Sequence, residues 1–527
     1  MLRQSFQIWK NGNHRVLRGL SSFSIDQEQV NRFGSTVQSN EYNNCRNLLA
    51  APYLDRKCGQ IRCTSSDDSN LLKNDLSKYK DLESKWRADP VITIIDTPQF
   101  KSILKKNVLD LVALFQKYNY EIRIAGGAVR DLLMNITPTD IDFATNATPK
   151  QMVEMFVTEN VRVIKSNGGI FGTITVRIND EENFEVTTLR IGVHTDGKQV
   201  DVEFTTDWLL DASRRDLTIN SMFLGFDGKV YDYFFGFDDL KNQRIVFVGE
   251  PTNRIKADYL RILRYFRFYG RVCENPNNFD AKAIKAIREN IDGLQIISGE
   301  RIRVELKKIL HGNHRIELLI KLIECGASRY MGFPAAVDCD DLLRLKQTLE
   351  TTFEDVDINW IIILSTLISS KDDAIHLNSR LKFKAGERDL AIFLGENKTA
   401  TRHIDDILHY QKMCVPQQGH SFKVRKDFVL ALLVYNGKRP IYDQLLDWKI
   451  PKYPVNRTIL EKHGCRGHSA ELILERLRLI WADSNFQISE NELLQQHLAD
   501  VKEKVFAELK ERKLQKKASR LRENITP

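Results

Sequence analysis

The sequence predicts an α+β fold in which an α/β head is followed by an all-α remainder. Up to about residue 250, short runs of alternating apolar and polar residues are separated by glycine-containing turns, a pattern typical of strands. From Arg254 onward, apolar residues recur at helical spacing almost without interruption. With 527 residues, the chain is long enough for several domains with sizeable cores.

The amino-terminal segment has the composition of a targeting sequence. It contains arginines, a lysine and several serines, and no acidic residue precedes Asp26. This pattern is typical of a mitochondrial transit peptide, although an ordinary disordered terminus is an alternative. We expect a transit peptide over residues 1–30 and a poorly ordered leader over residues 31–88, which are rich in asparagine, serine and charged side chains.

Composition narrows the functional classes further. The net charge of +8 permits nucleic-acid binding without proving it. The eight cysteines include no CxxC pair, which indicates a reducing compartment and no disulfide framework. The nearby His463, Cys465 and His468 lack a second cluster of ligands, so we expect no zinc site there. The apolar stretch Ile358–Ile368 is too short to span a bilayer, and we expect a buried helix.

The first candidate site residues lie in a strand–turn–helix unit. Glu121–Ala125 alternates as a strand, and Gly126 and Gly127 then permit a tight turn and a close backbone approach to a ligand. The residues that follow begin a helix, whose free N–H groups attract phosphate. Arg130 adds a forked, charged donor to the same anion. We therefore expect a phosphate cradle here.

Two carboxylates, Asp140 and Asp142, follow this unit. Residues two apart on a strand share a face, so we expect both carboxylates to converge. Two oxygen ligands beside a phosphate cradle suit Mg²⁺. Glu185, on a strand predicted further along, either brings a third carboxylate to this site or faces solvent. Each motif alone is usually only a turn or a solvated strand edge, but their order within one unit makes a site much more specific.

The most informative helical segment is Lys256–Phe268, which we predict as one helix. Asp258 and Arg261 are three residues apart and so are neighbours on one helix face. They form either an intrahelical ion pair or a base reader. The carboxylate can accept from the exocyclic amine of cytosine or adenine while the guanidinium donates to the adjacent ring nitrogen; uracil and guanine present the opposite pattern. Arg264 and Arg267 lie further round the helix, and periodicity alone does not bring all three arginines together.

Two other charged segments allow two interpretations each. Asp211 resembles a helix N-cap ahead of Arg214 and Arg215, which suit binding of phosphate or ribose but also suit a surface ion-pair network. The basic segment Lys502–Arg522 is either a solvated helix or an arm that contacts RNA phosphates.

Five motifs, in this order, carry a resemblance to a known family: Gly126-Gly127-Ala-Val-Arg130-Asp131, Asp140-Ile-Asp142, Arg214-Arg215-Asp216, Asp258-x-x-Arg261 and Glu300-Arg301-Ile-Arg-Val-Glu305. The chain resembles class II CCA-adding enzymes, which are tRNA nucleotidyltransferases of the polymerase-β-like superfamily, and in particular their eukaryotic mitochondrial form. The resemblance covers roughly Leu104 to the 480s and leaves out the leader and the basic tail.

The resemblance implies a nucleotidyltransferase head (89–250), a helical neck that recognises the nucleobase (251–312), a helical body (313–420) and a helical tail (421–527). It implies template-independent addition of the 3′-terminal CCA of tRNA, by Mg²⁺-dependent transfer of CMP and AMP from CTP and ATP to the tRNA 3′-hydroxyl. The acceptor arm of tRNA would be the macromolecular partner, and the protein would be a monomer or homodimer without a membrane segment. We expect it in the mitochondrial matrix, with cytoplasm and nucleus as further compartments.

Site residues follow from the resemblance position by position. It implies catalytic roles and Mg²⁺ binding for Asp140 and Asp142, and we add Glu185 as a third catalytic carboxylate. The nucleotide-binding residues it implies are Gly127, Arg130, Arg215, Asp258, Arg261, Arg264 and Arg267.

One position departs from the family pattern. The neck motif usually has Glu before its Asp, and this chain has Ala257 there. The resemblance gives that Glu the role of holding the arginine, so the fixity of Arg261 and the choice between C and A come into question. Two other functions remain alternatives: a poly(A) polymerase, which shares the head motifs, and a catalytically inert tRNA-binding protein. The inert protein is expected to lose the metal carboxylates, and both are present.

Overall fold

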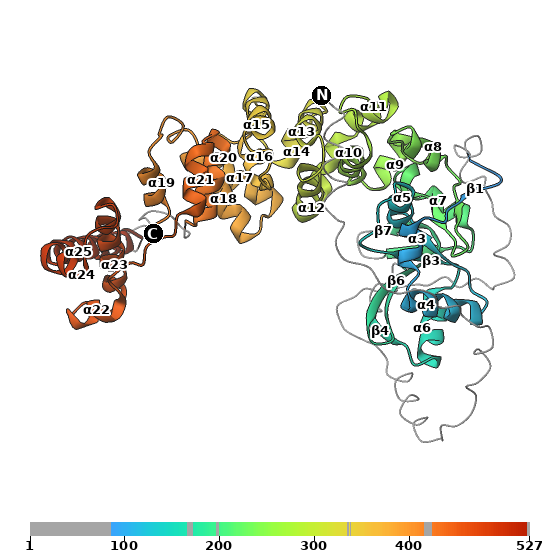
Figure 1. The fold of residues 1–527 in the computed structure, drawn as a ribbon, viewed down its shortest axis with the longest axis horizontal. Coiled ribbons are helices and arrows are strands. Elements are labelled where there is room, and N and C mark those ends of the chain that lie inside the picture. Colours follow the sequence, from blue (N-terminus) through green and yellow to red (C-terminus); the bar gives the residue numbers. More distant parts are fainter. Residues whose placement is uncertain are drawn as a thin grey trace, which may run out of the picture. The chain divides into compact units, whose positions relative to one another are not determined.

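The computed structural model describes residues 86–523 except 166–171, 196–199, 335–336, 338 and 416–423. The predicted transit peptide and nearly all of the predicted leader lie outside these residues. Within the described part, strands occur up to Tyr231 and helices alone follow (Figure 1), so the predicted α+β class is confirmed.

The head is built on an eight-stranded mixed sheet with the order β1-β10-β9-β2-β3-β6-β5-β4. Every neighbouring pair is antiparallel except β3 and β6, which run parallel. Two more strands, β7 and β8, form a separate antiparallel pair. The strands are β1 (Val91–Ile94), β2 (Ile122–Ala125), β3 (Asp142–Thr145), β4 (Arg162–Lys165), β5 (Thr173–Ile178), β6 (Glu182–Thr188), β7 (Arg190–Thr195), β8 (Val200–Phe204), β9 (Phe223–Leu224) and β10 (Lys229–Tyr231).

The helices of the head follow local sequence signals. In α6, Thr148 and Gln151 form a reciprocal capping box, and Pro149 occupies the first turn. In α7, the N-cap is Asp207, whose carboxylate accepts the N–H of Leu209 at 2.7 Å, so the cap-like role predicted for Asp211 is wrong. The helices are α3 (Pro98–Ile103), α4 (Lys106–Lys117), α5 (Gly127–Leu133), α6 (Pro149–Thr158), α7 (Trp208–Ser213) and α8 (Gly236–Lys241).

Seventeen α-helices are described after the head, together with short 3₁₀ and π segments. They are α9 (Pro251–Ala257), α10 (Arg261–Val272), α11 (Ala281–Glu289), α12 (Gly299–Leu310), α13 (Arg315–Glu324), α14 (Ser328–Met331), α15 (Asp340–Thr351), α16 (Trp360–Ser365), α17 (Lys371–Leu381), α18 (Ala385–Asn397), α19 (Ile407–Met413), α20 (Lys426–Asn436), α21 (Arg439–Asp447), α22 (Arg457–Lys462), α23 (Gly467–Asp483), α24 (Glu490–Glu492) and α25 (Leu498–Glu523).

The prediction of one continuous helix over Lys256–Phe268 is wrong. Helix α9 ends at Ala257, Asp258 is extended with φ −160° and ψ 106°, and α10 begins at Arg261. The Asp258 carboxylate accepts the backbone N–H of Leu260 at 3.1 Å. Such a local side-chain bond competes with helix continuation, which explains the break at this residue.

The core runs without interruption from the head into the helices. One cluster of buried apolar side chains extends from Phe100 to Leu445, and a second, from Val415 to Val505, belongs to the last helices. Helix α16 is buried along its length, which confirms the buried helix predicted for the Ile358–Ile368 stretch. Among the helices in the described ranges, none combines the length and apolar character that a bilayer crossing requires.

Candidate active site

A pocket of about 570 Å³ collects most of the predicted site residues. Its walls come from β2, α5, β3 and β6 of the head and from the α9–α10 link, α10 and α12. The predicted residues that line it are Gly127, Arg130, Asp142, Glu185, Arg215, Asp258, Arg261, Arg264 and Arg267. Residues more than 100 positions apart in the chain therefore meet around one space.

The carboxylates meet through the parallel strand pair. Asp142 on β3 lies in register with Glu185 on β6, so the two side chains lie side by side at the pocket. Desolvation, and then the charge of Glu185, raise the pKa of Asp142 above its usual value, while Arg215 opposes the shift.

Asp140 lies at the edge of this arrangement. Strand β3 begins at Asp142, so Asp140 sits in the preceding bend and is exposed; the prediction that both residues share a strand face is wrong. Asp140 is absent from the pocket lining, but its charge also raises the pKa of Asp142. Among the described residues, no group of three or more His, Cys, Asp or Glu side chains has an arrangement that could hold a metal ion.

The glycine turn brings the backbone close to an arginine. Gly126 has φ +65°, which favours glycine, and its N–H donates to Met222 O at 3.0 Å. A Cβ atom on Gly126 would lie 2.9 Å from Arg215 Nη1 and 3.3 Å from Asn220 O. The positive φ therefore favours glycine, and a larger residue there would also displace the guanidinium of Arg215.

A buried carboxylate orients the arginines of the head. Asp211, 1% exposed, accepts from Arg214 through one oxygen and from Arg215 Nε and Nη2 through the other, at 3.1 and 3.0 Å. Burial opposes ionisation of Asp211, but the charges of Arg215 and Arg214 outweigh it and hold the pKa below its usual value. This network is mostly buried, unlike the surface ion pairs that the sequence also allowed.

Arg130 is held in the same way on the other side of the turn. Its Nη1 donates to Asn220 Oδ1 at 2.5 Å and its Nη2 to Asp131 Oδ1 at 2.8 Å. Burial lowers the pKa of Arg130, and Asp131 opposes the shift. The guanidinium is therefore fixed before any ligand is bound, which reduces the ordering cost of anion binding.

The arginines of α10 have separate partners. Arg264 Nε donates to Asp216 Oδ2 at 2.5 Å, and Arg267 Nη1 lies 3.4 Å from Glu305 Oε1. Both arginines also line the pocket, whose walls come from α10 and the head. Although periodicity could not place them together, Arg261, Arg264 and Arg267 all line it.

Asp258 and Arg261 do not pair with each other among the hydrogen bonds and ion pairs of the described residues. Arg261 donates instead to two backbone carbonyls, Arg214 O at 2.8 Å and Arg254 O at 3.0 Å. Asp258 Oδ2 accepts from Arg301 Nη2 at 3.0 Å. Both remain in the pocket, but the intrahelical ion pair considered from the sequence does not form.

Other residues of the pocket were not singled out as site residues from the sequence. They include Arg190, Arg214, Asp216, Asn220, Phe268 and Arg301. Three of them, Arg214, Asp216 and Arg301, belong to the motifs that carry the family resemblance, so the sequence did contain a pattern that could have identified them. Phe268, in contrast, reads in the sequence as an ordinary apolar helix position.

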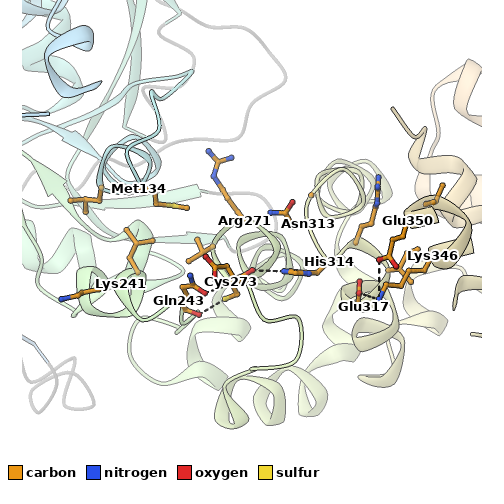
Figure 2. A pocket seen from close by; sticks show the side chains of 18 of the residues that line it. Met134, Lys241, Gln243, Arg271, Cys273, Asn313, His314, Glu317, Lys346 and Glu350 are labelled. Atoms are coloured by element: carbon orange, nitrogen blue, oxygen red, sulfur yellow. Dashed lines mark hydrogen bonds and ion pairs between the residues drawn. The ribbon is translucent and has the colours of Figure 1, made fainter. Parts of the chain in front are cut away.

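A larger pocket of about 980 Å³ lies elsewhere and contains none of the predicted site residues. Figure 2 shows Met134, Lys241, Arg271, His314 and other residues around it. Its charged residues are partly paired, as in the 2.6 Å contact between Lys346 and Glu317. Volume alone therefore does not mark the site, because the predicted site residues lie at the smaller pocket.

Comparison with known proteins shows similarities over much of the chain. A family model described as the poly(A) polymerase head domain matches residues 122–246, and one described as the probable RNA and SrmB-binding site of polymerase A matches residues 278–336. The mitochondrial CCA tRNA nucleotidyltransferase 1 of Homo sapiens is 44% identical over 405 residues, which cover 76% of this chain and 92% of that protein.

Two further similarities extend the comparison. The Danio rerio protein of the same description is 44% identical over 416 residues, covering 78% of this chain and 94% of that protein. The crystal structure of the Bacillus stearothermophilus CCA-adding enzyme with CTP aligns with a TM-score of 0.58 and 23% identity, over 79% of this chain and 100% of that one. This second similarity shows the fold.

Proposed function

Since the chain belongs to the family of CCA tRNA nucleotidyltransferases, as 44% identity over 92% of the human mitochondrial member shows, we propose that it adds the 3′-terminal CCA to tRNA without a nucleic-acid template. It transfers CMP and AMP from CTP and ATP to the tRNA 3′-hydroxyl and releases pyrophosphate. One observation carries this proposal. Carboxylates of the head, Asp258 and arginines of α10 all line the same pocket.

The reaction is an in-line displacement at phosphorus. The 3′-hydroxyl oxygen of tRNA attacks the α-phosphorus of CTP or ATP, the bond from that phosphorus to the bridging oxygen breaks, and pyrophosphate leaves as the hydroxyl proton is lost. Arg130 and Arg215, fixed by Asp131 and Asp211, offer positive charge to the triphosphate. Preorganised charges of this kind stabilise a transition state without reorganisation.

Mg²⁺ is part of the proposal. The carboxylates of Asp142 and Glu185 lie together and their repulsion helps to raise the pKa of Asp142, and a divalent cation would relieve this repulsion. We assign Mg²⁺ to Asp140 and Asp142, with Glu185 as the third catalytic carboxylate and substrate phosphates completing the coordination. When bound, the ion supplies Lewis-acid stabilisation of charge on the hydroxyl and phosphate oxygens.

Base choice falls to Asp258 and Arg261. The Asp258 carboxylate accepts from the exocyclic amine of cytosine or adenine, and Arg261 donates to the adjacent ring nitrogen, while uracil and guanine present repulsive groups at both places. Gly127, Arg264 and Arg267 complete the proposed nucleotide contacts. Because Arg261 already has two carbonyl acceptors, its position does not depend on the Glu that Ala257 replaces.

The proposed partners extend beyond the pocket. We assign nucleobase recognition to residues 251–312, and binding of the tRNA acceptor arm to the body (313–420) and tail (421–527). The relatives named above are mitochondrial, which supports the mitochondrion as the site of action of this chain. Cytoplasm and nucleus as further compartments, and a monomer or homodimer as the assembly, are parts of the same proposal.

The decisive test uses a tRNA that lacks CCA. With CTP alone the protein should add two residues, and with CTP and ATP it should add three. No addition from CTP, with repeated addition from ATP, would favour the poly(A) polymerase that the description of the head family keeps as the alternative. Removal of divalent cations with EDTA should stop addition, and Mg²⁺ should restore it.

The variant Asp142→Ala separates catalysis from binding. It removes one of the two carboxylates assigned to the metal, so addition should fall to background while the affinity for tRNA stays nearly unchanged. Equal activity of this variant and the unaltered protein would contradict the proposed site, and unchanged tRNA binding without activity in both would indicate the inert tRNA-binding protein.

A further inference from the structure

The carboxylate that reads the base is held by a residue outside the proposed reader. Asp258 Oδ2 accepts from Arg301 Nη2 at 3.0 Å, and Asp258 Oδ1 accepts the N–H of Leu260 at 3.1 Å. Each carboxylate oxygen of Asp258 thus accepts one hydrogen bond from the protein. Since a carboxylate oxygen can accept two, each keeps a second acceptor position for a ligand. Arg301 is the third residue of α12 and lines the same pocket as Asp258.

Among the described contacts, the Arg261 side chain makes no hydrogen bond to the Asp258 carboxylate. Its two hydrogen bonds go to the backbone carbonyls of Arg214 and Arg254, so its guanidinium is fixed independently of Asp258. The two groups proposed to read the base are therefore positioned separately. Backbone carbonyls position the donor, Arg261, and Arg301 positions the acceptor, Asp258.

The surroundings of Asp258 explain why an anchor is needed. Burial lowers the pKa of Arg261, and the nearby Asp216 and Asp258 carboxylates oppose this shift. Asp258 thus lies close enough to the pocket arginines to be attracted by them. A carboxylate released from its anchor would turn toward these cations, and its free acceptor positions would no longer face an incoming base.

We propose that Arg301 is a positioning residue for nucleotide choice, which holds Asp258 so that its open acceptor positions meet the exocyclic amine of cytosine or adenine. This inference rests on the proposed function. Arg301 acts through Asp258 and needs no contact with the substrate. Its side chain is 51% exposed and that of Asp258 is 34% exposed, and an ion pair this open adds little to stability, so variants of Arg301 should fold.

The experiment compares Arg301→Ala and Arg301→Lys with the control Lys307→Ala. Lys307 lies on the same helix, is 46% exposed and pairs with Glu387 at 3.3 Å, away from the pocket. Steady-state incorporation of CTP, ATP and UTP is measured on a tRNA lacking CCA and on one ending in CC. The melting temperature and the KM for tRNA are measured in parallel.

Arg301→Ala should raise the KM for CTP and ATP and lower the preference for CTP over UTP about tenfold, toward the lower end of what one base-reading pair contributes. Arg301→Lys should recover part of this preference because one charged donor suffices for the single bond. Lys307→Ala should behave like the unaltered protein. These changes should leave the melting temperature within a few degrees.

Two results would overturn the inference. One is an unchanged preference for CTP over UTP in Arg301→Ala. The other is a raised KM for tRNA with unchanged nucleotide preference, which would mean that Arg301 contacts RNA. If the unaltered protein adds no CCA, the proposed function fails instead, so the two failures are distinguishable.

Discussion

At the scale of single residues, Phe268 organises more of the pocket than any sequence pattern indicates. Its ring, 3% exposed, lies 4.7 Å from the guanidinium carbons of Arg130 and Arg267 and 5.3 Å from that of Arg264. Three like charges repel one another, and the negative face of an aromatic ring offsets part of that repulsion. Phe268 therefore helps to hold together arginines that come from α5 and α10.

Replacing this ring should weaken nucleotide binding without changing base choice. Phe268→Leu keeps an apolar side chain but removes the ring, a loss of about 1 kcal/mol for each close cation–π contact, so the KM for CTP and ATP should rise together, roughly three- to tenfold. The preference for CTP over UTP should stay constant because Asp258 and Arg261 are not touched. Steady-state kinetics with the three nucleotides measures both effects.

A matched control lies on the same helix. Phe266 is also buried, but its ring packs against Tyr265 and Phe279. Phe266→Leu should lower stability to a similar extent and leave the KM values in place. Equal KM values in both variants would mean that the arginines are held by their carboxylates alone.

The same scale shows what the sequence could predict. The sequence placed Gly126 and Arg130 at one site because a glycine pair ahead of a helix and a nearby arginine form a local pattern, and both line the pocket. The contact between Asp258 and Arg301 joins residues 43 positions apart, and Asp142 meets Glu185 only because β3 and β6 pair in parallel. Such contacts depend on packing between elements, which hydrophobic periodicity does not encode.

At the scale of elements, α12 carries Arg301 to the pocket and is fixed at its first residue. Gly299 is buried, and a Cβ atom there would lie 1.8 Å from the carbonyl oxygen of Arg380 at the end of α17. The Arg380 side chain in turn donates to Leu294 O at 2.8 Å and to Ile297 O at 3.0 Å. The start of α12 is thus pressed directly against another backbone.

Gly299→Ala should therefore force α12 and α17 apart. Overpacking of this kind typically costs about 1–3 kcal/mol, and a backbone atom cannot move aside as a side chain can. We expect a loss of free energy of unfolding toward the upper end of that range, measured by urea denaturation. Because α12 positions Arg301, the preference for CTP over UTP should also fall.

Gly386 provides the control for this prediction. It lies in α18, and no atom outside its own chain neighbours and helix backbone lies within 4 Å of a Cβ placed there. Gly386→Ala should raise stability by about 0.5–1 kcal/mol, because alanine favours the helix. If Gly299→Ala proved as stable as the unaltered protein, the close seat of α12 on α17 would be contradicted.

The break between α9 and α10 shows a limit of element prediction. Apolar spacing over Lys256–Phe268 continues without a gap, and no glycine or proline interrupts it, so the sequence favours one helix. The structure breaks the helix at Asp258, where the carboxylate binds the N–H of Leu260 instead of leaving it to the helix. A local side-chain bond thus overrides the helical pattern of the sequence.

At the scale of the whole molecule, positive charge is distributed unevenly. In the pocket, Arg130, Arg215 and Arg264 are paired with carboxylates. In the second half of α25, the stretch Lys510–Arg522 contains a single acidic residue, Glu511, among many lysines and arginines. The sequence of this stretch therefore contributes a surplus of basic residues to the net charge of +8.

The packing of α25 separates this basic stretch from the core. Val505 is fully buried in the cluster formed by the last helices, and Leu509 packs against that cluster. Residues 510–515 are exposed. A chain ending at Leu509 thus keeps the packed part of α25 and loses only the basic part, which allows charge to be tested without loss of the fold.

Removing residues 510–527 should weaken tRNA binding and leave nucleotide binding unchanged. Each basic side chain that contacts a phosphate releases a counterion, so the slope of binding against salt concentration should flatten, and the KM for tRNA should rise about tenfold at low salt. The KM for CTP and the melting temperature should stay constant, since neither the pocket nor the buried cluster is altered.

Replacing Lys510, Arg512 and Lys513 by glutamine in the full chain should reproduce part of the effect while keeping the helix. If the KM for tRNA and its salt dependence match those of the full chain, the segment is a solvated helix and acceptor-arm binding lies elsewhere.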